Sequence, residues 1–127
     1  MKSVLDTSVL LGPMPDVIAG ELAVSSATLA ELHFGVLVAR NDAVRAERLR
    51  RLGDIERTFE ALSIDAAVAR HYGRLAAAVT AVGRQPRVRV LDLLIAATAA
   101  AHGARLVTRN ASDLVGIEHL VEIVALT

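Results

Sequence analysis

The sequence predicts an α/β fold in which a small central parallel sheet is flanked by helices. Short runs rich in Val, Leu and Ile alternate with longer helical patterns, as in successive strand–helix–strand units joined by right-handed crossovers. Hydrophobic residues make up 54% of the chain and aromatic residues only 2%, which suits Val- and Leu-rich strands covered on both faces by helices. The 127 residues are enough for one core, so we expect a single domain over residues 1–127.

In the first half of the chain, strands are expected in three short apolar runs at residues 3–5, 22–24 and 62–64. Pro13 and Pro15 mark the loop after the first strand, and a short helix is expected over residues 16–19. Ser25 or Ser26 can cap a helix that runs to about Val38. Residues 41–61 are rich in Arg and Glu and predict a helix, in which Gly53 is the candidate point of interruption.

In the second half, Asp65 can cap a helix that extends to about residue 82. Apolar residues recur there at helical spacing, at Val68, Tyr72, Leu75, Val79 and Val82. Residues 83–89 form a basic loop, and residues 91–102 predict an Ala-rich helix ended by Gly103. Strands are expected at 105–108 and 121–126.

The composition excludes cysteine-based sites and indicates where in the cell the protein is expected. The chain has no cysteine, which excludes disulfides and thiolate metal sites and fits a reducing compartment. No stretch approaches the ~18 consecutive apolar residues of a membrane span. Asp6 interrupts the N-terminal segment where a signal peptide needs an apolar run. We therefore expect a cytoplasmic protein that does not associate with a membrane.

Charge is distributed unevenly along a chain whose net charge is zero. Residues 40–89 carry eleven arginines and six acidic residues, a net charge of +5, and the remainder carries a net charge of −5. Taken alone, this pattern is typical of solvated helix faces with salt bridges. Its meaning depends on where the acidic residues lie.

Four carboxylates stand in apolar or small-residue surroundings: Asp6, Glu31, Asp92 and Asp113. In an open parallel sheet, functional groups gather at the carboxyl ends of the strands. Three of the four follow a predicted strand directly or lie early in the next helix. The fourth, Asp92, lies in the apolar segment Val90–Ala97, which we expect to be buried and to offer no basic partner on its own helix face. An unpaired carboxylate there would be costly, so it requires a partner, a proton or a metal ion.

Each acid also has a purely structural interpretation. Asp6 can close a turn with Thr7 and Ser8, and Glu31 can form a capping box with Thr28. Asp92 can be a helix N-cap, and Asp113 can close an Asx turn or act as an N-cap. These interpretations are simpler one by one, but jointly they are weaker because all four acids would meet at one end of one sheet. Such an all-oxygen cluster favours Mg²⁺ or Mn²⁺ over zinc.

Four segments resemble, in order, the motifs of PIN-domain ribonucleases: Leu5–Leu11, Ser26–Gly35, Arg89–Ala97 and Leu106–Leu114. The resemblance spans nearly the whole chain, and the length and motifs resemble the VapC-type toxins of bacterial toxin–antitoxin systems most closely. Leu114 stands where many members carry Phe.

This resemblance implies an α/β/α sandwich and an endoribonuclease that needs Mg²⁺ or Mn²⁺ and cuts structured cellular RNA of the tRNA or rRNA class. It also implies a homodimer and a cognate antitoxin protein that occludes the active site. The implied catalytic acids are Asp6, Glu31, Asp92 and Asp113, with Asp6 and Asp92 holding the principal metal. The implied supporting residues are Thr7, Thr108 and Asn110.

Arginines near these motifs are candidates for binding the RNA backbone. They are Arg84, Arg87, Arg89 and Arg109. The positively charged segment then has a candidate role as an electrostatic funnel around an acidic centre. The scarcity of aromatic residues favours recognition of the shape and backbone of folded RNA over base stacking.

Other functional classes fit less well. A phosphoacceptor receiver domain needs a lysine after a late strand, but Lys2 is the only lysine. A haloacid-dehalogenase-type phosphatase needs a second Asp two residues after Asp6, where Ser8 stands. The alternative that remains is a catalytically silent PIN-fold module that binds RNA or protein. The full set of four acids argues against it, because a scaffold gains nothing from retaining charges that repel one another.

Overall fold

The computed structural model describes residues 1–15, 18 and 20–127, and within them it confirms the predicted α/β class. Five parallel strands form one sheet in the order β3-β2-β1-β4-β5. Their bounds are Lys2–Leu5 for β1, Glu21–Ser25 for β2, Glu60–Leu62 for β3, Arg105–Thr108 for β4 and Ile123–Ala125 for β5. Of the short helix expected over residues 16–19, residues 16, 17 and 19 lie outside those described.

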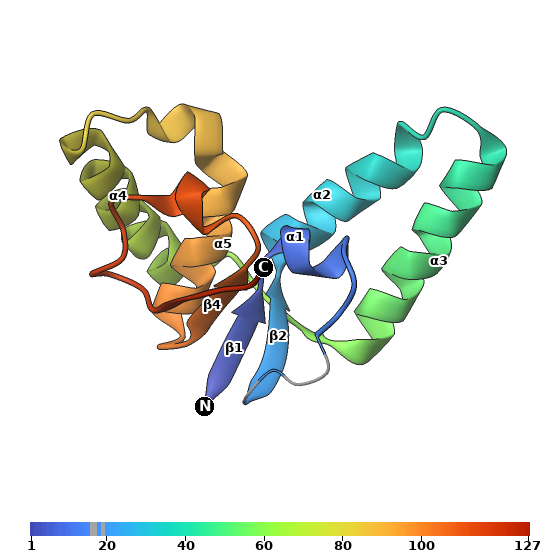
Figure 1. Ribbon diagram of the computed structural model, residues 1–127, viewed down its shortest axis with the longest axis horizontal. Coiled ribbons are helices and arrows are strands. Elements are labelled where there is room, and N and C mark those ends of the chain that lie inside the picture. The colour runs from blue at the N-terminus through green and yellow to red at the C-terminus, as the bar shows by residue number, and fades with distance from the viewer. Residues whose placement is uncertain (16–17, 19) are drawn as a thin grey trace.

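The α-helices of the described residues are α1 (Thr7–Leu10), α2 (Ser26–Leu37), α3 (Asp42–Thr58), α4 (Ala66–Ala81) and α5 (Val90–Ala101). Two 3₁₀ turns, Pro86–Arg89 and Ala111–Leu114, complete the pattern. Figure 1 shows α2 and α3 as a hairpin on one side of β1 and β2, with α4 and α5 on the other side. No helix of these residues is long and apolar enough to span a membrane.

Alternate residues of the central strands face two separate hydrophobic clusters. Val4, Ala23 and Leu106 pack with α4 and α5 on one face of the sheet. Leu5 and Val24, with Val107, pack on the other face with residues of α1 and with Ile55 of α3. This alternation follows from the pleat of a strand, and it explains why the strands read as continuous apolar runs.

Several predicted boundaries are wrong in an informative way. The helix expected over 41–61 continues through Gly53 without interruption. It ends at Thr58, because Phe59 is extended and leads into β3. The strand expected at 62–64 therefore lies at 60–62. The basic loop contains the 3₁₀ turn Pro86–Arg89, and Val82, expected on a core stripe, is 52% exposed.

Two helices end in the same way. Gly83 and Gly103 follow α4 and α5 with positive φ angles of 81° and 61°. At each end the following residue, Arg84 or Ala104, donates its N–H back to the helix, as in a Schellman motif. The predicted stop at Gly103 is confirmed, and the turn at Gly83 directs the basic loop back towards α5.

Candidate active site

Strand register brings the first and fourth motifs together. Leu5 of β1 is paired with Val107 of β4, so the next residues, Asp6 and Thr108, emerge side by side at the carboxyl edge of the sheet. The Asp6 N–H extends the pairing by donating to the Val107 carbonyl at 2.9 Å. Asp6 therefore lies at the carboxyl edge of the sheet, where the acids were predicted to lie.

The Asp6 carboxylate is held by three donors and is only 8% exposed. Its Oδ1 accepts the backbone N–H of Thr7 at 2.9 Å, which makes Asp6 the N-cap of α1. Its Oδ2 accepts the hydroxyls of Ser8 at 2.8 Å and Thr108 at 2.7 Å. The turn with Thr7 and Ser8 exists as the structural interpretation expected, but the bond from Thr108 joins this carboxylate to the opposite motif.

Glu31 reaches the same region from α2. Thr7 Oγ1 donates to Glu31 Oε1 at 2.8 Å, and it lies 3.1 Å from Thr28 Oγ1. The N-cap of α2 is Ser25, so the Thr28–Glu31 capping box predicted as an alternative is wrong. Glu31 is oriented by a threonine of the first motif instead.

Asp92 and Asp113 share one basic neighbour. Arg89 Nη2 lies 3.1 Å from Asp113 Oδ1, and its Nη1 lies 3.8 Å from Asp92 Oδ2. The expectation that Asp92 has no basic partner on its own helix is therefore wrong, because Arg89 precedes it by three residues. Asp92 is also not fully buried, since its side chain is 34% exposed. Neither acid is an N-cap, because α5 and the 3₁₀ turn begin after Arg89 and Asn110.

Asp92 lies in the electrostatic field of the other three acids. The pKa of Asp92 is raised from its ordinary value of 3.8, first because burial penalises the charged form. The charges of Asp6, Glu31 and Asp113 raise this pKa further, and Arg89 opposes them. Asp6, Asp92 and Asp113 also line one small pocket together with Asn110. The structure thus brings together carboxylates from the first and the last quarter of the chain.

The fit of this cluster to a metal ion rests on its donor chemistry. Within the described ranges, no three carboxylate or imidazole side chains already form a set that could enclose a metal ion. Asp6 is engaged by hydroxyls, and Arg89 lies against Asp92 and Asp113. The donors are nevertheless all oxygen, and besides the effect of burial, Asp6 and Glu31 each raise the pKa of Asp92 more than Arg89 lowers it. A small divalent cation suits that environment.

The four predicted RNA-binding arginines differ in their surroundings. Arg87 is exposed, and Arg84 donates to the Ser112 carbonyl at 3.0 Å, which ties the basic loop to the fourth motif. Arg89 is paired with the acids as described above. Arg109 donates to the carbonyls of Pro13 and Thr127, so its guanidinium connects the loop after α1 to the end of the chain. Their binding of RNA stays a prediction.

Sequence reasoning missed part of the support around the acids. Besides donating to Asp6, Ser8 accepts the backbone N–H of Arg109 at 3.0 Å, and its place in the first motif was the available signal. Asn110, which was predicted as a supporting residue, donates its backbone N–H to Thr108 Oγ1 at 3.0 Å. Arg48 and Arg51 of α3, which lie near Glu31 in a second pocket, had no signal in the sequence.

Comparison with known proteins identifies the family. The family model described as PIN domain matches residues 3–112, which takes in the first three motifs and most of the fourth. The chain belongs to the PIN-domain family. Ribonuclease VapC5 of Mycobacterium tuberculosis is 39% identical over 113 residues, which are 84% of this chain and 82% of that protein. Ribonuclease VapC4 of the same organism is 38% identical and covers 86% of each chain.

Solved structures show that this PIN domain shares its fold with VapC proteins. The crystal structure of VapBC-5 from M. tuberculosis, a member of the VapBC family of toxin–antitoxin systems, matches with a TM-score of 0.79 and 34% identity over 98% of both chains. FitAcB from Neisseria gonorrhoeae matches with a TM-score of 0.77 and 26% identity over 95% of both chains. The predicted PIN-like α/β/α architecture and VapC-type resemblance are confirmed.

Proposed function

We propose that this PIN domain is the ribonuclease toxin of a VapC-type toxin–antitoxin system, and that it hydrolyses phosphodiester bonds in structured cellular RNA of the tRNA or rRNA class. The observation that carries the proposal is the set of carboxylates at the sheet edge, where Asp6, Asp92 and Asp113 line one pocket and Thr7 donates to Glu31. Burial, and then the charges of the other three acids, raise the pKa of Asp92, and a perturbed carboxyl in such a cluster is typical of a functional site. Relatives 38–39% identical to the chain are named ribonucleases, which supports the same reaction.

The residues divide into ligands and supports. Asp6 and Asp92 would hold Mg²⁺ or Mn²⁺, and Glu31 and Asp113 would orient water and complete the charge. When bound, such an ion supplies a water of lowered pKa and positive charge next to the phosphate. The hydroxyls of Ser8 and Thr108 donate to Asp6 and orient its carboxylate. Hydrogen bonds of this kind hold a ligating side chain in the direction that a metal ion requires.

Arg89 supplies the positive charge next to Asp92 and Asp113. Its pairing with Asp92 and Asp113 offsets part of their repulsion in the absence of a cation. In the proposed reaction, this guanidinium would turn towards the RNA phosphate as the acids engage the metal ion. Arginine suits both positions because its planar fork pairs with carboxylates and phosphates alike.

Cleavage of total cellular RNA by the purified protein tests the proposal. We expect discrete fragments with Mg²⁺ or Mn²⁺, none with EDTA, and none from Asp6→Asn or Asp92→Asn. Asp42→Asn is the matched control, because Asp42 is a fully exposed carboxylate at the start of α3 that pairs with Arg45 of its own helix. It should cleave as the wild type does.

Thermal melting with and without Mn²⁺ separates a folded, inactive protein from a misfolded one. Ligand binding to the native state raises its stability, so an intact site should melt at higher temperature with Mn²⁺. Intact RNA in every reaction, with no stabilisation by either metal, would overturn the catalytic proposal. The chain would then be a binding module for RNA or protein.

The proposal includes two protein partners. The solved relatives are described as members or complexes of toxin–antitoxin systems, which supports a cognate antitoxin for this chain. We also propose a homodimer, as the family resemblance implies. Light scattering on the isolated chain should give twice the monomer mass, and a monomer at all concentrations would refute the dimer.

A further inference from the structure

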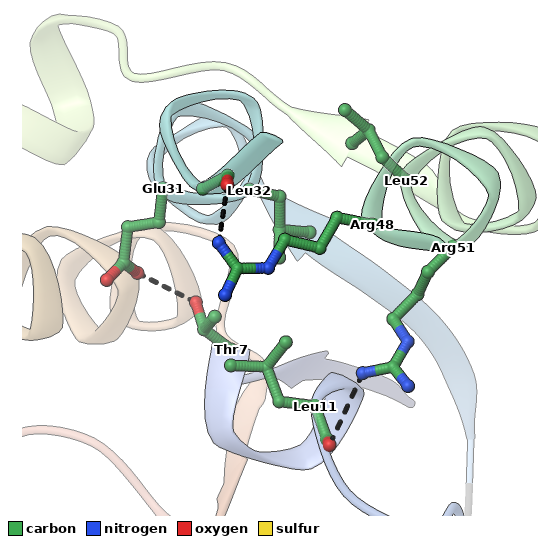
Figure 2. A pocket seen from close by; sticks show the side chains of 8 residues that line it. Thr7, Leu11, Glu31, Leu32, Arg48, Arg51 and Leu52 are labelled. Carbon is green, nitrogen blue, oxygen red and sulfur yellow. Dashed lines mark hydrogen bonds between the residues drawn. The ribbon is translucent and has the colours of Figure 1, made fainter. Parts of the chain in front are cut away.

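A second pocket lies beside the acidic site, between the α2–α3 hairpin and α1. It has a volume of about 500 Å³ and is lined by Thr7, Leu11, Glu31, Leu32, Gly35, Arg48, Arg51 and Leu52. Figure 2 shows Arg48 and Arg51 reaching from α3 towards α2 and α1, with Glu31 and Thr7 at the other end of the pocket. The pocket therefore joins a basic end to one of the catalytic acids.

The arginines of α3 fall into two groups. Arg45, Arg50 and Arg57 each pair with a carboxylate on their own helix. The pairing of Arg50 with Glu47, at 2.6 Å, is strong enough to lower the pKa of that glutamate. These three side chains form the solvated, internally neutralised helix face that the sequence predicted for most of this segment.

Arg48 and Arg51 are different because they donate to backbone carbonyls without also pairing with a carboxylate in the part of the chain that the structure describes. Arg45, by contrast, donates to the Ala39 carbonyl and pairs with Asp42 as well. Arg48 Nη1 donates to the Gly35 carbonyl at 2.6 Å, and Arg51 Nη1 donates to the Leu11 carbonyl at 3.4 Å. Among the described residues, no carboxylate forms an ion pair with either guanidinium. Arg51 is only the smallest of the causes that lower the pKa of Glu47. A carbonyl orients a guanidinium without neutralising it, so two positive charges are held at fixed places with further N–H donors available.

The position of these charges points to the ligand. Thr7 lines the pocket and also donates to Glu31, so the pocket opens onto the carboxylate cluster. An RNA strand that approaches four carboxylates meets electrostatic repulsion, which oriented cations on its path can offset. Guanidinium groups bind phosphate oxygens through two parallel N–H bonds, a geometry that lysine does not offer.

We propose that Arg48 and Arg51 form a subsite for the phosphodiester backbone of the RNA substrate, adjoining the catalytic acids through Glu31 and Thr7. This inference rests on the proposed ribonuclease function and adds two substrate-binding residues to it. The backbone atoms of Gly35 and Leu11 position the two guanidinium groups. The subsite contacts the strand on the α2–α3 side of the site, opposite the basic loop at residues 84–89.

Fluorescence anisotropy with end-labelled bulk tRNA tests the subsite in an Asp92→Asn background, so that the RNA stays intact. In Arg48→Gln/Arg51→Gln we expect binding about 10-fold weaker, and a log–log salt slope smaller by about 1 for each phosphate that the protein no longer neutralises. The control is Arg50→Gln/Arg57→Gln, which removes the same charge from the same helix. Its affinity should stay within about 2-fold of the parent if those arginines only face solvent.

Two further measurements guard against a purely structural effect. Melting temperatures show whether each double variant is folded. Arg48→Lys/Arg51→Lys keeps both charges but not the guanidinium fork, so it should recover most of the affinity and the salt slope while remaining weaker than the parent.

Three outcomes would overturn the subsite. Equal weakening by the two Gln pairs would mean that only overall charge matters. Unchanged tRNA binding in a folded Arg48→Gln/Arg51→Gln protein would exclude a phosphate contact. If that variant binds tRNA as the parent does but no longer binds a labelled oligoglutamate peptide, the pocket would be assigned to the carboxylates of a protein ligand.

These outcomes are separable from those for the ribonuclease itself. If the wild type cleaves RNA, and the arginine substitutions change neither tRNA binding in the Asp92→Asn background nor cleavage when Asp92 is kept, the subsite falls and the nuclease stands. If no metal-dependent cleavage occurs but tRNA binding depends on the two arginines, the nuclease falls and an RNA-binding site remains.

Discussion

Replacing Thr108 by Val removes one hydroxyl at the junction of two motifs while keeping the shape of the side chain. Thr108 is fully buried, and its Oγ1 both donates to Asp6 Oδ2 at 2.7 Å and accepts the N–H of Asn110 at 3.0 Å. Val fills the same volume, so no cavity forms. The substitution therefore tests the hydrogen bonds alone.

The expected decrease in stability follows from those hydrogen bonds. A hydrogen bond to a charged group contributes about 1.5–3 kcal/mol. Asn110 is exposed, so water can replace the acceptor of its N–H. We therefore expect Thr108→Val to be less stable by about 2 kcal/mol, which lowers the Tm of a domain of this size by roughly 6–10 °C. Because the Asp6 oxygen is left with one donor fewer, Mn²⁺ affinity should fall by roughly 10- to 100-fold.

Urea unfolding gives the stability change, and Mn²⁺ titration followed by calorimetry gives the affinity. Thr80→Val is the matched control, because Thr80 is exposed on α4 and its hydroxyl donates only to the Ala76 carbonyl. Its stability should change by less than about 0.5 kcal/mol. A Thr108→Val protein with wild-type stability and wild-type Mn²⁺ affinity would refute the role of this threonine in holding Asp6.

Three further predictions concern the acids and the core. Asp92→Asn should stabilise the metal-free protein at neutral pH by at most about 1 kcal/mol, after allowing for solvent screening, because burial and then the repulsion from three neighbouring acids oppose the charge of Asp92. A raised pKa destabilises the fold only while the carboxyl is ionised, so this advantage should disappear as pH falls towards 3.8; an advantage that persists in acid would contradict the charge explanation. Arg89→Gln should destabilise the metal-free protein by about 0.5–1 kcal/mol and increase the Tm gained with Mn²⁺, since Asp92 and Asp113 lose their internal cation; a smaller gain than in the wild type would refute competition between the two cations. Leu93→Ala should cost about 2–5 kcal/mol in urea unfolding, because Leu93 is fully buried in the cluster that α4 and α5 form with the sheet; a decrease below ~1 kcal/mol would mean that the core closes over the cavity.

The fold class could be predicted because its signals are local. The order of strands and long helices follows from short apolar runs, N-cap residues such as Asp65, and the glycine that ends α5. Helix α1 was missed because four residues are too few to show a helical period. The end of α3 was placed three residues too late, because pairing of β3 with β2 decides where that helix stops.

The sequence by itself determined which carboxylates belong to the candidate site, because each lies in a motif that is recognisable within ten residues. Tertiary structure alone decided how they are held. Thr108 donates to Asp6 across 102 residues of chain, and Arg89 pairs with Asp113 from a separate segment. The distinction between Arg48 and Arg50 is equally non-local. Arg50 pairs with a carboxylate of its own helix, whereas Arg48 donates to the carbonyl of Gly35 in α2. Periodicity and capping act over a few residues, whereas pairing of side chains depends on register and packing that only the folded chain provides.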